Sequence, residues 1–255
     1  MKTVIILAFI MLFGSCRPGQ HSDVVLSSLD RQTLYPALFN VPAQNEWCQW
    51  EPSPSEKDST NVSSDGLCHT RLDTILYYAD AGTNRAVIIF GTYEFENGGM
   101  VFCHACNPMV SIAVAQKSEQ NAWRVINFIK NFGTHGEWSA QPDYRIGRLG
   151  RNDFLVEDAG YSNQGIVQNW TFFYHLPSLA ASLTLESMDN SMMISDINSL
   201  NEWADSIKDI SEGNTTSVIV TRQGTWTEEG KEQQSGDQVT EYVLNDSNIF
   251  RPVSR

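Results

Sequence analysis

The sequence predicts a mainly β protein built as an antiparallel meander, in the form of a barrel, a sandwich or a small propeller-like fold. Two observations support this fold class. Short apolar segments rich in Val, Ile, Phe, Tyr and Trp recur along the chain, and Gly, Asn, Asp and Pro separate them. Strands spaced this closely, with no helical pattern between most of them, are joined most simply by successive hairpins.

The predicted strands begin at residue 74 and continue almost to the end of the chain. In order, they cover residues 74–79, 86–95, 99–103, 110–116, 123–128, 144–149, 153–158, 167–175, 181–187, 217–223 and 238–244. Turn-forming sequences such as Asp80-Ala81-Gly82 and Asn97-Gly98-Gly99 lie between most of them. These signals predict that neighbours in sequence are neighbours in the sheet.

One amphipathic helix is predicted near residues 196–210. Asp196 suits its N-cap, Gly213 supplies a stop, and apolar residues recur between them at helical spacing, namely Ile197, Leu200, Ala204, Ile207 and Ile210. A shorter helix, interrupted by Pro36, is predicted over residues 29–39. The polar residues 51–66 are predicted to form an exposed loop.

The charge balance limits the partners that the chain can have. It carries 30 acidic residues against 17 Lys and Arg, which gives a net charge of −13 at pH 7, and it has no basic run. We therefore expect neither nucleic acid nor an anionic membrane surface as a partner.

Residues 1–16 have the features of an export signal. Lys2 precedes an apolar run that is shorter than the ~20 residues of a membrane-spanning helix. The stretch Phe13-Gly14-Ser15-Cys16 resembles the lipobox of bacterial lipoproteins, in which the cysteine is acylated and becomes the first residue. An ordinary secretory signal cut near Ser15 is the alternative.

The lipobox resemblance implies a particular domain organisation and location. Residues 1–15 would be a signal peptide, residues 16–25 a tether with a lipid such as palmitate on Cys16, and residues 26–255 a single extracytoplasmic domain. The protein would sit on the cell membrane or the outer membrane, facing the periplasm or the exterior. Residues 103–175 are also similar to stretches of uncharacterised exported bacterial proteins, a resemblance that implies no activity.

Four cysteines remain beyond Cys16, and an even number in an oxidising compartment predicts two disulfides. We favour pairing Cys48 with Cys68 and Cys103 with Cys106, because each pair closes a loop that is local in sequence. A structural role is therefore expected for all four.

The Cys103-His104-Ala105-Cys106 motif has two other interpretations. One is a thiol–disulfide exchange site, although Asn107-Pro108 and a predicted strand follow where a thioredoxin-like site has a helix. The other is a zinc site formed by Cys103 and Cys106 together with Cys48 and Cys68, to which His69 or His104 could be added. The structural disulfide remains the favoured interpretation, and we expect no metal and no cofactor.

The segment around Gly136 concentrates His135, Glu137 and Trp138 in one turn-like stretch. These three residues are candidate ligand-binding residues, as is Tyr161 in the polar segment 160–165. The alternative is a glycine-mediated turn with its tryptophan over the edge of the core.

Catalysis by carboxylates is the other function that this part of the chain could support. Glycoside hydrolysis uses two acidic side chains that flank the scissile bond. Glu137 could contribute to such a pair with other acidic residues, namely Asp143, Asp153, Glu157 and Asp158. Their spacing selects no pair, and no GxSxG, HExxH, EF-hand or phosphate-binding loop is present. We assign no catalytic residue.

The sequence thus predicts a non-catalytic cell-envelope lipoprotein. It would act as a binding or structural module for an envelope protein or glycan, and it would contact the membrane through its N-terminal lipid. Two alternatives remain open: an exported glycan hydrolase that uses loop carboxylates, and a thiol–disulfide oxidoreductase centred on Cys103 and Cys106.

Overall fold

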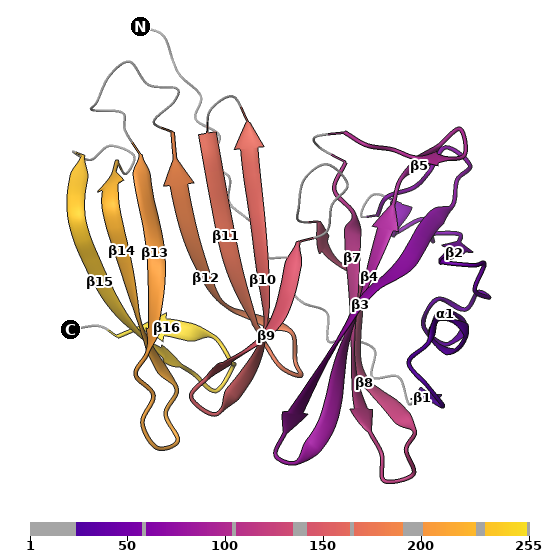
Figure 1. Ribbon diagram of the computed structural model, residues 1–255, viewed down its shortest axis with the longest axis horizontal. Helices are drawn as coiled ribbons and strands as arrows, with labels where there is room; N and C mark the ends of the chain where they lie inside the picture. Colours follow the sequence, from indigo (N-terminus) through magenta and orange to yellow (C-terminus); the bar gives the residue numbers. More distant parts are fainter. Residues whose placement is uncertain are drawn as a thin grey trace, which may run out of the picture.

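The computed structural model describes residues 24–57, 60–103, 106–134, 142–163, 166–190, 201–227 and 233–253. Two antiparallel sheets stand side by side, and the single helix of the described residues lies on the outer side of the N-terminal sheet (Figure 1). The predicted mainly β, antiparallel fold is confirmed. No helix in the described ranges is long and apolar enough to span a membrane.

The N-terminal sheet has six strands in the order β1-β8-β7-β4-β3-β2. Their bounds are β1 Val25–Leu26, β2 Trp47–Trp50, β3 Cys68–Asp80, β4 Thr83–Tyr93, β7 Met109–Lys117 and β8 Trp123–Thr134. A small hairpin, β5 Phe95–Glu96 and β6 Gly99–Met100, lies between β4 and β7 in the chain. The chain passes from β1 at one edge to β2 at the other through the helix α1, Arg31–Phe39.

The C-terminal sheet is a curled meander of eight strands, in which every strand pairs with its neighbours in sequence. Its strands are β9 Asp143–Leu149, β10 Asn152–Asn163, β11 Ile166–His175, β12 Ala180–Asp189, β13 Glu202–Asp209, β14 Ser217–Trp226, β15 Gln234–Leu244 and β16 Phe250–Pro252. The expected succession of hairpins therefore holds for this half of the chain.

Three clusters of buried side chains hold the two sheets and the helix together. The first lies between α1 and the N-terminal sheet and includes Leu34, Tyr35 and Phe90. The second joins the two sheets, with Val87 and Ile112 on one side and Leu155 on the other. The third fills the curl of the C-terminal sheet.

The helix α1 begins at Arg31, close to the predicted start at residue 29. Asp30 caps it, because its carboxylate accepts the amide of Thr33 at 2.9 Å. Tyr35, which is fully buried, connects the helix to the residue before β2 and to β3. Its hydroxyl donates to the Glu46 carbonyl at 2.8 Å and accepts from the Leu72 amide at 2.7 Å. These bonds orient α1 across the face of the sheet.

The predicted helix near residues 196–210 is wrong over the residues that the structure describes, since residues 202–209 form the strand β13. Residues 196–200 lie outside the described residues. Along β13 the half-buried Trp203, Asp205 and Ile207 alternate with exposed neighbours, and the strand pairs with β14 along its whole length. This two-residue period and the pairing across strands override the helical spacing of the apolar residues.

The predicted disulfide between Cys48 and Cys68 is also wrong, because both are unbridged, buried thiols. In the β2–β3 ladder Cys48 lies opposite Thr70, and Cys68 lies opposite Trp50. The two cysteines therefore occupy diagonal positions, typically ~7–8 Å apart, which is too far for a disulfide. The predicted bond between Cys103 and Cys106 is present.

Candidate functional site

Only one of the four predicted ligand-binding residues lies in the described part of the chain. His135, Glu137 and Trp138 lie outside it. Tyr161 belongs to the strand β10, where it pairs with Gln168 instead of lying in a loop, and 39% of it is exposed.

Of the described carboxylates of the proposed hydrolase, Asp143 and Asp158 lie directly opposite each other in the β9–β10 ladder, so their side chains share one face of the sheet. Asp153 is buried and receives two hydrogen bonds from Arg148, at 2.7 and 3.1 Å. Asp158 is held by Arg145 and by the Thr171 hydroxyl, and Glu157 and Asp153 lie on the other face of β10.

Glu157 is fully buried between the two sheets. Tyr144 lies directly opposite it on β9, and Tyr174 contacts it from β11. Burial, together with the negative charge of Glu157, raises the pKa of both tyrosine hydroxyls. Glu157 therefore forms part of a buried polar cluster on the inner face of the C-terminal sheet, and a ligand cannot reach it without opening the core.

The disulfide between Cys103 and Cys106 lies in the connection before β7, which starts at Met109. A strand follows the motif, as the sequence predicts, instead of the helix of a thioredoxin-like site. In the described parts of the chain, no three His, Cys, Asp or Glu side chains gather closely enough to hold a metal ion.

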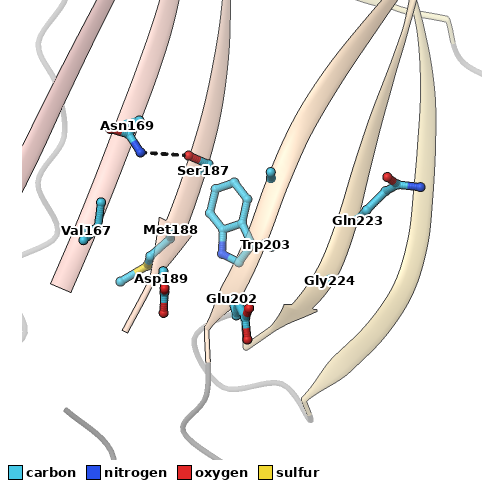
Figure 2. A pocket seen from close by; sticks show the side chains of 10 residues that line it. Val167, Asn169, Ser187, Met188, Asp189, Glu202, Trp203, Gln223 and Gly224 are labelled. Carbon is cyan, nitrogen blue, oxygen red and sulfur yellow. Dashed lines mark hydrogen bonds between the residues drawn. The ribbon is translucent and has the colours of Figure 1, made fainter. Parts of the chain in front are cut away.

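A pocket of about 430 Å³ opens on the C-terminal sheet around Trp203. Four neighbouring strands line it, through Val167 and Asn169 of β11, Ser187, Met188 and Asp189 of β12, Glu202, Trp203 and Ala204 of β13, and Gln223 and Gly224 of β14. Figure 2 shows the indole of Trp203 at the centre of this group, between the side chains of β12 and Gln223 of β14. We call this the Trp203 pocket.

Arg222 supports one face of the Trp203 ring. Its guanidinium carbon lies 3.7 Å from the ring centroid, close enough for a cation–π contact. The carboxylate of Asp205 holds the guanidinium through two hydrogen bonds of 2.8 and 3.0 Å and accepts the Glu186 amide as well. Because Asp205 is itself mostly buried, this assembly fixes the indole before any ligand arrives.

Glu186 belongs to the same charged group behind the Trp203 ring. Burial raises the pKa of its carboxyl group, Arg222 opposes this effect, and the nearby negative charge of Asp205 adds to it. The group therefore places one guanidinium between two carboxylates, which favours a single orientation of Arg222.

Gly224 allows β13 and β14 to approach closely at Trp203. It has φ +128°, and a Cβ atom there would lie 2.1 Å from the Glu202 carbonyl oxygen and 2.8 Å from the Trp203 Cα. Trp203 pairs with Gly224, which pairs in turn with Gly236 of β15. The position of the indole therefore depends on a residue without a side chain in the neighbouring strand.

The polar lining of the pocket offers both donors and acceptors of hydrogen bonds. Asn169 donates to the Ser187 hydroxyl at 3.3 Å, as Figure 2 shows. Asp189 lies directly opposite Glu202 in the ladder, and the described residues that line the pocket include no Lys or Arg. The two carboxylates of this described lining disfavour an anionic ligand, whereas a neutral ligand rich in hydroxyl groups suits it.

The sequence analysis missed this pocket, because it predicts a helix over the segment that contains Trp203. The alternation of Trp203, Asp205 and Ile207 was the one local signal that could have revealed a strand with an aromatic side chain on one face. The pairing of Trp203 with Arg222 and Gly224 depends on the register of two strands, which no local pattern encodes. Comparisons of the chain with protein-family models, with curated proteins and with solved structures find no match.

Proposed function

We propose that this protein is a non-catalytic, lipid-anchored binding protein of the bacterial cell envelope, and that its Trp203 pocket holds a neutral segment of an envelope glycan. The observation that carries the proposal is the Trp203 indole, which Arg222 supports on one face and which lines a pocket together with polar residues of four strands.

The chemistry of sugars matches this arrangement. The apolar C–H face of a pyranose ring packs on an indole, and its hydroxyl groups both donate and accept hydrogen bonds. In the Trp203 pocket the amides of Asn169 and Gln223 can do both, and the carboxylate of Glu202 accepts. Because Arg222 already holds the indole in place, less conformational entropy is lost when a ligand binds.

The location of the protein rests on its N-terminal sequence. Phe13-Gly14-Ser15-Cys16 supports acylation of Cys16, and residues 16–25 would tether the domain to the cell membrane or the outer membrane. This proposal involves no cofactor and no nucleic acid, and the contact with the membrane is the lipid itself.

Binding to a panel of neutral oligosaccharides tests the function. The purified full-length protein in detergent should bind at least one member of the panel, with the dissociation constant measured by calorimetry. Trp203→Ala should weaken that binding at least tenfold, about 1.4 kcal/mol, whereas Trp203→Phe should retain part of it. Phe102→Ala, which removes an exposed aromatic side chain that lines neither described pocket, is the matched control. Absence of binding, or binding unchanged by Trp203→Ala, would refute the proposal.

Mass spectrometry of the protein isolated from its native membrane tests the anchor. Acyl chains on an N-terminal Cys16 are the expected result. A mature chain that begins elsewhere without lipid would refute the anchor and leave the glycan site to be judged separately.

A further inference from the structure

We propose that the N-terminal sheet carries a second ligand site, the Tyr77–Trp123 pocket, and that this site binds an acidic sugar. The pocket has a volume of about 320 Å³ and is lined by Tyr77, Tyr78, Asn84, Arg85, Lys117 and Trp123. It shares no residue with the Trp203 pocket, and the inference does not depend on the function proposed for that pocket.

Strand register places four of the lining residues on one face of the sheet. Lys117 of β7 pairs with Trp123 of β8, and both lie near the end of their hairpin. On β3 and β4, Tyr77 pairs with Ala86, and Asn84 lies two residues before Ala86 and so points to the same side. This is the face that α1 covers farther along the strands, where Ala86 and Ala115 join its core cluster.

Tyr77 and Trp123 form the aromatic part of the site. Their ring centroids lie 6.0 Å apart at 50°, although β4 and β7 separate their strands. Ala86 and Ala115, which are fully buried, belong to these two central strands, and their small side chains let the rings approach above them. Tyr77 is nevertheless 64% exposed, which leaves most of its surface available to a ligand.

The charge of this pocket is opposite to that of the Trp203 pocket. The Lys117 ammonium lies 5.8 Å from the Trp123 ring centroid, and Arg85 lies on the adjoining position of β4, where it pairs with Asp80. The described residues that line the pocket include no Asp or Glu. Because Arg85 already pairs with Asp80 and shares the face of Tyr78, Lys117 is the cation on the face of the aromatic rings. In a chain with a net charge of −13, this lining favours a ligand with a negative charge.

The strands beneath the pocket favour a sugar over a peptide strand. Both β4 and β7 are paired on each side, so no free backbone edge is available there for strand addition. A ligand must therefore lie across the side chains and stack on the aromatic rings. An acidic sugar meets both requirements, since its ring can pack on Tyr77 and Trp123 and its carboxylate can pair with Lys117.

Titration with tri-galacturonate, and with galactotriose as the neutral counterpart, tests this site in the full-length protein in detergent. Tri-galacturonate should bind, and its affinity should fall as the salt concentration rises. Tyr77→Ala and Lys117→Gln should each raise its dissociation constant at least fivefold. Tyr77 is exposed and Lys117 is partly exposed, so neither substitution should disturb the core. An unchanged thermal unfolding temperature would confirm that both variants are folded.

Trp203→Ala separates this inference from the proposed glycan site. It should leave tri-galacturonate binding unchanged while it weakens binding of the neutral oligosaccharide. Equal binding of the acidic and neutral trisaccharides to the Trp203→Ala variant, tri-galacturonate binding that Lys117→Gln leaves intact, or no binding of tri-galacturonate would each overturn the inference. Binding of acidic peptides with higher affinity than tri-galacturonate would overturn it as well.

Discussion

Replacing Gly224 by Ala tests whether the close approach of β13 and β14 positions Trp203. The backbone at Gly224, with φ +128°, is one that residues with a side chain rarely adopt. That conformation alone should cost about 1–3 kcal/mol of the free energy of unfolding. The added Cβ would also lie 2.1 Å from the Glu202 carbonyl oxygen, so β13 must move. Overpacking of this kind typically adds about 1–3 kcal/mol.

Gly236→Ala is the matched control for this prediction. Gly236 lies directly opposite Gly224, has a comparable φ of +115°, and no atom lies within 4 Å of the Cβ it would gain. The control should therefore bear only the conformational cost. We expect Gly224→Ala to lower the free energy of unfolding by about 1–3 kcal/mol more than Gly236→Ala does.

Urea unfolding, followed by circular dichroism, measures this difference directly. The same two variants should differ in ligand binding, because only Gly224→Ala displaces the strand that carries Trp203. Equal stability losses in the two variants would refute the conclusion that contact with β13 requires glycine at position 224.

Three further predictions concern the core and the helix. Tyr35→Phe removes a hydroxyl that bonds two backbone groups, and leaving them unsatisfied should cost about 1–3 kcal/mol in urea unfolding; a neutral effect would contradict the observed bonds. Burial raises the pKa of the Cys48 thiol to about 12 and that of Cys68 to about 11, so neither should react with Ellman's reagent at pH 8 until guanidinium unfolds the protein; rapid reaction of the folded protein would contradict this. The Ser28 hydroxyl, together with backbone amides, lowers the pKa of Asp30 below 3.8. Asp30→Ala should therefore cost about 1 kcal/mol at pH 7, and the difference from the unmodified protein should shrink as the pH falls through this lowered pKa; a difference that persists at pH 2 would argue against it.

Features that depend on local chemistry could be predicted from the sequence. Ala81 and Gly82 both have positive φ, as does the pair Asn97 and Gly98, which is the conformation that tight hairpin turns require. These turn sequences, and the apolar segments between them, were enough to predict the antiparallel meander.

Features that depend on strand register could not be predicted. The Cys48–Cys68 pairing seemed favourable from the short loop it would close, but the β2–β3 register places the two thiols on a diagonal. The strand β13 was mistaken for a helix because Ala204 and Ile207 fit a three- to four-residue period, and the support that Arg222 gives from β14 is invisible in the local sequence.

The candidate site was missed for the same reason. The Trp203 pocket gathers side chains from four strands, and each contributes residues that are unremarkable alone. The predicted cluster of His135, Glu137 and Trp138 was visible because its members are close in sequence, and it remains a prediction. Glu157 seemed available for catalysis until the fold placed it between the two sheets.

The most direct test of the Trp203 pocket is to follow the indole N–H signals of the protein by NMR during titration with the neutral oligosaccharide that it binds. Trp203→Phe assigns the signal of Trp203 by its disappearance. If the pocket holds the ligand, this signal should shift the most, and its titration curve should give the dissociation constant found by calorimetry. A Trp203 signal that stays in place while other indole signals shift, or while the ligand still binds, would contradict the assignment of this pocket as the glycan site.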